Sequence, residues 1–182
     1  MSSSGGSSSS GRVLIEQIVL SVAAASVSFS QIPQNYAHLE VEALARTLTV
    51  AETDTWVILF NGAGSANFDV LGVVTNNNLL TVYTATNTGY LSGDLYLPGI
   101  SATAGVWGRL HMWIPFYTNT NYDRVCHLDG GMVDGVNIAT GGYGFTCEAL
   151  YRSTAALSAI NLSNVGVGYL AIGSIFNLYG VT

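Results

Sequence analysis

Acidic and histidine side chains come closest to a metal-binding pattern between positions 123 and 129. His127 and Asp129 stand two residues apart, so on a β-strand they share one face, and Asp123 falls on that face as well. Carboxylate and imidazole groups on one face are ligands for a divalent ion. The sequence offers no second cluster to complete the coordination shell, and Gly130 and Gly131 indicate a bend. The pattern therefore favours a solvated strand end, and we predict no metal ion and no other cofactor.

Motifs for catalysis are missing from the sequence. His38 and His111 stand alone on the expected polar faces of strands, away from any nucleophile in a recognised motif. There is no Gly-x-Ser-x-Gly elbow and no Walker-type phosphate loop, and the glycine-rich stretches 61–64 and 141–144 are typical of hairpin turns. The eleven acidic residues form no obvious acid–base pair. We therefore expect no catalytic residue and no enzyme. A Ser–His–Asp triad is defined by geometry and stays open, with a glycan hydrolase as the third-ranked function.

Aromatic side chains crowd the segment from position 107 to position 122. Such rings stack on sugars, and they serve equally well as anchors in cores and protein interfaces. Because tryptophans carried by strands normally pack, the core or interface role is favoured. The candidate residues, for an interface or for glycan contact, are Trp107, Trp113, Phe116, Tyr117 and Tyr122.

The composition is that of a protein with little charge. Of the 182 residues, 49% are hydrophobic and only 9% are Asp, Glu, Lys or Arg, against about 25% in an ordinary globular domain. Protein interfaces are depleted of charge and enriched in aromatic residues. The composition therefore favours a subunit with much of its surface in contact with other proteins. An extracellular β protein with a neutral surface is the alternative.

Charge and hydropathy patterning also exclude several partners. The net charge is −6 with only 5 Lys and Arg, which argues against direct binding to nucleic acid. No apolar run reaches the roughly 18 residues of a membrane span, and we recognise no targeting signal. The two cysteines, Cys126 and Cys147, are best explained as small buried hydrophobic residues, although a disulfide stays open.

The chain divides into a short arm and one domain. Residues 1–11 are almost entirely Ser and Gly, which predicts a flexible arm. Residues 12–182 show the apolar alternation of β-strands, clearest between His38 and Arg46, where Leu39, Val41 and Ala43 share one face. The strand at 106–114 is bulky on both faces, which predicts either a central position in a sheet or a face that meets a partner. The other expected strands lie near 13–20, 26–30, 56–60, 68–74, 79–84, 95–97, 124–128, 142–151, 159–162 and 169–179.

Short strands at regular spacing with Gly and Asn turns predict an all-β fold. We expect an antiparallel β-sandwich of jelly-roll type with about nine to eleven strands, in which the first and last strands lie close together. Little or no helix is expected, at most a turn or two near Ser153–Leu157. The first strand changes phase between Ile15 and Ile18.

A set of landmarks in a fixed order gives the chain a family resemblance. From about Arg12 to Thr182 the chain resembles small β-sandwich virion proteins of tailed bacteriophages, of the decoration or tail-associated type. No catalytic residues come with this resemblance. The landmarks are Val27–Leu39 (VSFSQIPQNYAHL), Ala45–Arg46, Phe60–Gly62, Ile114–Pro115, Ser158–Leu162 and Ile172–Val181 (IGSIFNLYGV).

The resemblance implies a structural protein of the virion, assembled in the cytoplasm of a bacterial host. We expect a capsid decoration or cement protein that forms homotrimers and clamps other virion proteins, such as the major capsid protein. Its Ser/Gly arm would reach along the shell. The alternative is a tail-fibre, baseplate or receptor-binding component that recognises host glycan. Neither role involves direct contact with nucleic acid or membrane.

Overall fold

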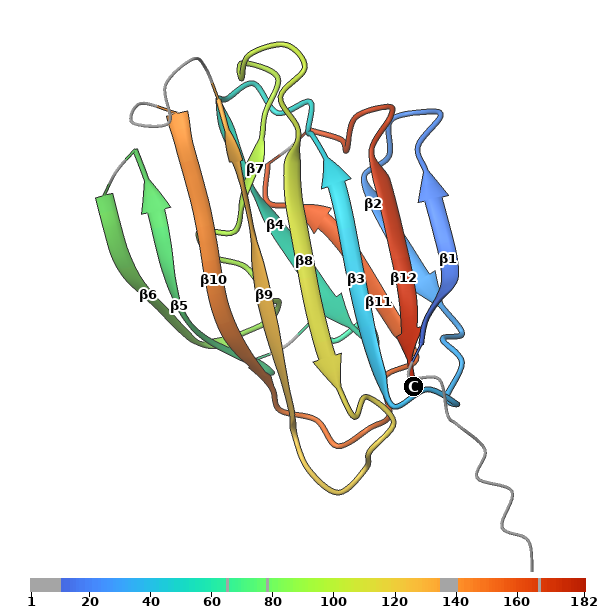
Figure 1. The fold of residues 1–182 in the computed structure, drawn as a ribbon. Helices are drawn as coiled ribbons and strands as arrows, with labels where there is room; N and C mark the ends of the chain where they lie inside the picture. The colour runs from blue at the N-terminus through green and yellow to red at the C-terminus, as the bar shows by residue number, and fades with distance from the viewer. Residues whose placement is uncertain (1–10, 65, 78, 135–140, 167) are drawn as a thin grey trace, which may run out of the picture.

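The computed structural model describes residues 11–64, 66–77, 79–134, 141–166 and 168–182. Regular structure in these residues consists of twelve β-strands (Figure 1). They are β1 (Arg12–Val19), β2 (Ser26–Ser30), β3 (His38–Ala45), β4 (Thr53–Phe60), β5 (Phe68–Asn76), β6 (Leu79–Thr88), β7 (Tyr96–Pro98), β8 (Gly108–Pro115), β9 (Arg124–Val133), β10 (Gly142–Tyr151), β11 (Ala159–Asn164) and β12 (Ile175–Val181).

The strands form two antiparallel sheets of unequal width. The larger has the order β1-β12-β3-β8-β9-β10-β5-β6, and the smaller has the order β2-β11-β4-β7. In Figure 1 the smaller sheet lies behind the larger one. The predicted all-β sandwich is confirmed, with one strand more than the upper end of the predicted range.

Little or no helix is expected from the sequence, and the segment Ser153–Leu157, where a helical turn could form, is an irregular bend. The Asn61 side chain explains why the bend needs no helical hydrogen bonds. Its Nδ2 donates to the carbonyl of Ala156 at 2.9 Å, and its Oδ1 accepts from the backbone N–H of Ser158 at 2.8 Å. An outside amide thus satisfies backbone groups that a helix would otherwise pair.

The two ends of the described chain meet, as predicted. Strand β1 pairs with β12 from Arg12 opposite Val181 onward, and the register shifts between Leu14 and Glu16. This β-bulge is the physical form of the predicted phase change, since one extra residue reverses which face the following side chains occupy. Just before β1, Gly11 donates its N–H to Thr182 Oγ1 at 3.2 Å. Residues 1–10 of the predicted arm lie outside the described residues.

The core lies between the inner faces of the two sheets. Strand β3 turns Leu39, Val41, Ala43 and Ala45 inward, all at most 4% exposed, as the alternation predicts. Strands β8 and β4 contribute their own alternating side chains, which are fully buried. Burial of apolar surface at about 25 cal/mol per Å² is what holds the two sheets together. These two strands supply Leu110, Met112, Ile114, Trp56, Ile58 and Phe60.

Strand β8 lies between β3 and β9, which confirms its predicted central position. Further along the same sheet, Cys126 on β9 and Cys147 on β10 are buried and form no disulfide. Burial raises the pKa of the Cys147 thiol to about 12 and raises that of Cys126 as well. Both cysteines therefore behave as the small buried hydrophobic residues that the sequence favours.

One arginine is buried beneath the loop that joins β8 to β9. The Arg124 side chain is 1% exposed and donates to the backbone carbonyls of Tyr117 (3.1 Å), Ser153 (2.7 Å) and Asn119 (2.6 Å). These three bonds connect the β8–β9 loop to the bend that follows β10. The guanidinium thus holds in place the loop that contains Phe116 and Tyr117.

Replacing this arginine should be costly. Arg124→Met leaves three buried carbonyl groups without their donors, so we expect the free energy of unfolding to fall by roughly 3 kcal/mol. Urea denaturation followed by tryptophan fluorescence measures the change. The matched control is Arg109→Met, because the Arg109 side chain is 60% exposed and its ion pair is worth at most about 1 kcal/mol. Equal losses in the two variants would contradict the assignment.

Candidate functional site

Charged side chains gather on the outer face of the larger sheet, the face turned away from the core. The first group is centred on Arg12 of β1. Its Nε contacts Glu40 at 2.8 Å and its Nη2 contacts Glu42 at 2.8 Å, both on β3. Strand β12 separates β1 from β3, and the guanidinium crosses it over the ring of Tyr179, 3.5 Å from the ring centroid. Ion pairing and a cation–π contact therefore tie three neighbouring strands together.

The second group is centred on His111 of β8. Its Nε2 lies 2.7 Å from Glu40 Oε1, and its Nδ1 lies 2.8 Å from Asp129 Oδ1 on β9. Each carboxylate accepts a hydrogen bond, so both bonds exist together only when both ring nitrogens carry a proton. Arg109 completes the group by donating to Asp129 Oδ2 at 2.8 Å.

The environment of Asp129 changes its acidity. Partial burial by itself raises the pKa of this carboxyl group. The hydrogen bond from His111 and the charges of Arg109 and His111 outweigh that effect, so the pKa is lowered overall. The ionised form of Asp129 is thus the form that the folded sheet stabilises.

The structure separates the residues of the candidate metal cluster. Asp129 binds His111 and Arg109, whereas His127 Nδ1 contacts Glu148 Oε1 on β10 at 2.8 Å. Asp123 is exposed and precedes β9. In the part of the chain that the structure describes, no three His, Cys, Asp or Glu side chains are arranged to hold a metal ion.

His38 and His111 are isolated in the sequence, but both have contacts in the structure. His111 bridges two carboxylates, and His38 packs against aromatic rings at the C-terminal end of β8. The His38 ring centroid lies 4.9 Å from that of Trp113 and 4.8 Å from that of Phe116. The backbone N–H of Phe116 also donates to His38 Nδ1 at 3.2 Å. These contacts hold an exposed Phe116 ring at the end of the strand.

The five candidate aromatic residues do not form one surface. Trp113 and Phe116 share the cluster with His38. Tyr117 is fully buried in the core, and its hydroxyl donates to the carbonyl of Pro33. Tyr122 is exposed in the β8–β9 loop, and Trp107 lies just before the other end of β8. Alternation along β8 and the turn after it send the rings in different directions.

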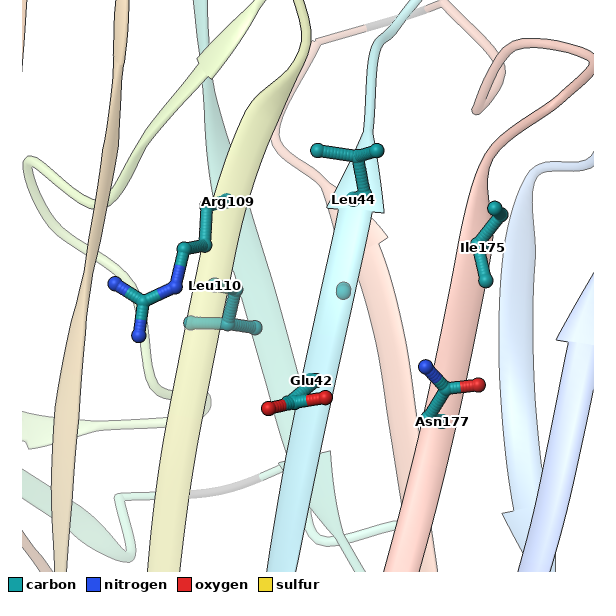
Figure 2. A pocket seen from close by; sticks show the side chains of 7 residues that line it. Glu42, Leu44, Arg109, Leu110, Ile175 and Asn177 are labelled. Atoms are coloured by element: carbon teal, nitrogen blue, oxygen red, sulfur yellow. The ribbon is translucent and has the colours of Figure 1, made fainter.

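Shallow hollows mark the same outer face, and two of them adjoin Arg109. One, of about 360 Å³, is lined by Glu42, Leu44, Arg109, Ile175 and Asn177 with backbone of the strands beneath. Figure 2 shows Leu44 and Ile175 toward one end, Glu42 and Asn177 toward the other, and the Arg109 guanidinium directed away from the middle. The hollow thus presents a carboxylate and an amide beside two aliphatic side chains.

The second hollow, also of about 360 Å³, lies on the other side of Arg109. Trp107, Met132 and Tyr143 line it together with the glycine backbone of β9. A tryptophan and an arginine that line one hollow are side chains suited to stacking on a ligand and to donating hydrogen bonds to it. This is the hollow in which one of the predicted aromatic residues takes part.

Sequence reasoning misses Arg12, Glu40, Glu42 and Tyr179 as parts of this face. A signal existed, because Glu40 and Glu42 alternate on the polar side of β3 in a chain with only 11 acidic residues. Their partner Arg12 lies far away in sequence and reaches them only through the pairing of β1 with β12. No local pattern contains that information.

Comparison with known proteins does not extend the functional argument. Neither the scan against protein-family models nor the search of curated proteins finds a match. Among the described residues there is no helix with the length and hydropathy needed to cross a membrane.

The charge of Asp129 should support stability in a pH-dependent way. Because its pKa is lowered on folding, its contribution is complete above the ordinary value of 3.8 and is lost as the pH falls through the lower folded pKa. We expect Asp129→Asn to reduce the free energy of unfolding by about 1 kcal/mol at pH 7, since the pair is partly exposed. The difference from the wild type should shrink as the pH falls below 3.8. Chemical denaturation at several pH values measures it, with the exposed Asp123→Asn as control. A difference independent of pH would contradict the ionic role.

Proposed function

We propose that the chain is a non-enzymatic structural protein of a bacteriophage virion, in the role of a capsid decoration or cement protein. The observation that carries the proposal is the apolar outer surface. Twenty large hydrophobic side chains are exposed among the described residues. Exposed apolar groups that lie next to one another mark protein contact surfaces. They include Leu71, Leu79, Leu80 and Val82 on the neighbouring strands β5 and β6.

The strand order supports a jelly roll as the particular kind of sandwich. Four pairs are nested along the chain, namely β1 with β12, β2 with β11, β3 with β8 and β4 with β7. The chain passes from one sheet to the other between β1 and β2, β2 and β3, and β3 and β4. Such a nested, double-sheet arrangement of eight strands is the jelly-roll pattern, which viral capsid and lectin domains use. On this proposal, β5, β6, β9 and β10 are additions that widen one sheet.

The partners of such a protein are further copies of itself and other virion proteins, such as the major capsid protein. A protein that binds only the assembled shell stabilises it by mass action. The low charge and net charge of −6 suit contacts with protein better than contacts with nucleic acid. The Ser/Gly arm, of which residues 1–10 lie outside the described chain, has the composition of a linker that reaches a neighbouring subunit.

A homotrimer in solution is the expected result for this role. Sedimentation velocity at micromolar concentration should give a particle of three 19.1-kDa chains, or of a multiple of three if trimers associate further. Apolar contacts weaken little with ionic strength, so the particle should persist at 1 M salt. A monomer under both conditions would count against the proposed role.

A second candidate function is glycan recognition by a tail-fibre or baseplate component. The observation that favours it is the hollow lined by Trp107, Arg109 and Tyr143, because stacking on an aromatic ring is combined there with hydrogen-bond donors. The exposed Phe116 beside His38 and Trp113 provides a second aromatic surface.

A glycan array tests the second candidate. If the hollow binds sugar, the wild type should bind a defined set of glycans, and Trp107→Ala should reduce that binding at least tenfold, which corresponds to loss of about 1.4 kcal/mol. Trp113→Ala tests the other aromatic surface in the same way, and Tyr122→Ala in the exposed loop is the control. Absence of reproducible binding by the wild type would exclude this candidate.

A further inference from the structure

Strand β6 forms an open edge of the larger sheet. It pairs on one side with β5, from Leu79 opposite Asn76 to Thr88 opposite Phe68, and the sheet order ends with it. Figure 1 shows β6 at the outer left of the sheet with β5 as its neighbour. Its Leu79, Leu80 and Val82 side chains are 67%, 68% and 69% exposed. The outer row of backbone N–H and C=O groups is thus available to another strand.

This edge lacks the usual protection against pairing. The sequence has no charged residue between Asp69 and Asp94, and the stretch 79–85 (LLTVYTA) has no proline and no glycine. The bulge in the β5–β6 ladder lies beyond Ala85, so the first seven residues of β6 pair regularly. Charges, prolines and bulges are the devices by which sheet edges avoid association.

The opposite edge of the same sheet is protected. Strand β1 carries Arg12 and Glu16 and is interrupted by the bulge between Leu14 and Glu16. The β1 edge thus carries features that prevent pairing with another strand, whereas the β6 edge lacks them, as expected if only β6 pairs with another protein. The chain has a net charge of −6, so two copies repel each other in general, and the uncharged β6 edge is where they can approach.

We propose that β6 pairs with β6 of a second copy of this chain, antiparallel and across a two-fold axis, so that the two larger sheets become continuous. An axis at Val82 places Val82 opposite its own copy and Leu80 opposite Thr84, with no charged residue in any pair. Apolar and β-branched cross-strand pairs stabilise a sheet. On the outer face, Leu71 and Val73 of β5 lie beside Thr84 and Val82, so one apolar patch meets its copy.

The contact is isologous, as two-fold contacts are. The β6 pairing rests on the proposed function in one respect, because both the pairing and that function require copies of the chain to associate. It adds a defined surface and symmetry, separate from any three-fold contact. A trimer that also uses β6 would therefore form a particle with an even number of chains.

Charge placed on the axis tests the pairing. V82K puts two ammonium groups opposite each other, so we expect the particle mass measured by sedimentation to fall to one half of the wild-type value. V22K is the matched control, because Val22 is also 69% exposed but lies outside the strands. Thermal unfolding of both variants by circular dichroism confirms that the subunit still folds.

A cysteine at the same position gives a positive signal. V82C places a thiol opposite its own copy, so mild oxidation should produce a covalent dimer on a non-reducing gel. Cys126 and Cys147 are buried and provide no background in the wild type. V22C should remain monomeric on the same gel.

The outcomes separate this inference from the proposed function. A wild-type trimer whose mass V82K leaves unchanged, with no V82C dimer, overturns the β6 pairing and leaves the proposed function standing. A wild-type monomer that gives no V82C dimer overturns both. A wild-type dimer that V82K converts to monomers supports the pairing and contradicts the homotrimer.

Discussion

The unequal width of the two sheets is the constraint on which the rest of the structure depends. Strand β7 at the edge of the smaller sheet packs toward β8, β9 and β10, while β5 and β6 extend beyond it (Figure 1). The aromatic rings of Phe60, Phe68 and Tyr151 pack together beneath β5. Tyr83 and Ala85 of β6 pack against the core, but most residues of this strand are exposed. A sheet that outgrows its partner must either expose apolar surface or find other protein to cover it.

Most of the few charged side chains form contacts that hold the strands of the chain itself in place. Arg12, Glu40, His111 and Asp129 connect β1, β3, β8 and β9 through contacts of 2.7–2.8 Å. Arg124 is buried under the loop, where it binds carbonyl groups. Little charge is left to keep the remaining surface apart from other proteins. The same composition that gives the sheet its cross-links thus leaves an outer surface suited to assembly.

Local sequence was sufficient for the strands but not for the contacts between distant ones. Period-two alternation located β3 and β8, because a half-buried strand must alternate whatever lies around it. It also marked the bulge in β1 as a phase change. The candidate aromatic residues were a different matter. Trp113 and Phe116 both pack against His38 of β3, whereas Tyr117 is buried in the core.

The sequence by itself determined the all-β class, the position of nearly every strand, and a surface poor in charge. These properties follow from the residue types and their spacing along the chain. Only the tertiary structure decided which polar side chains meet, since His111 finds Glu40 and Asp129 through strands that are far apart in sequence. It also decided that β6 is an edge. The residues of β6 do not by themselves mark an edge strand, and only the pairing of whole strands shows that β6 has a single neighbour.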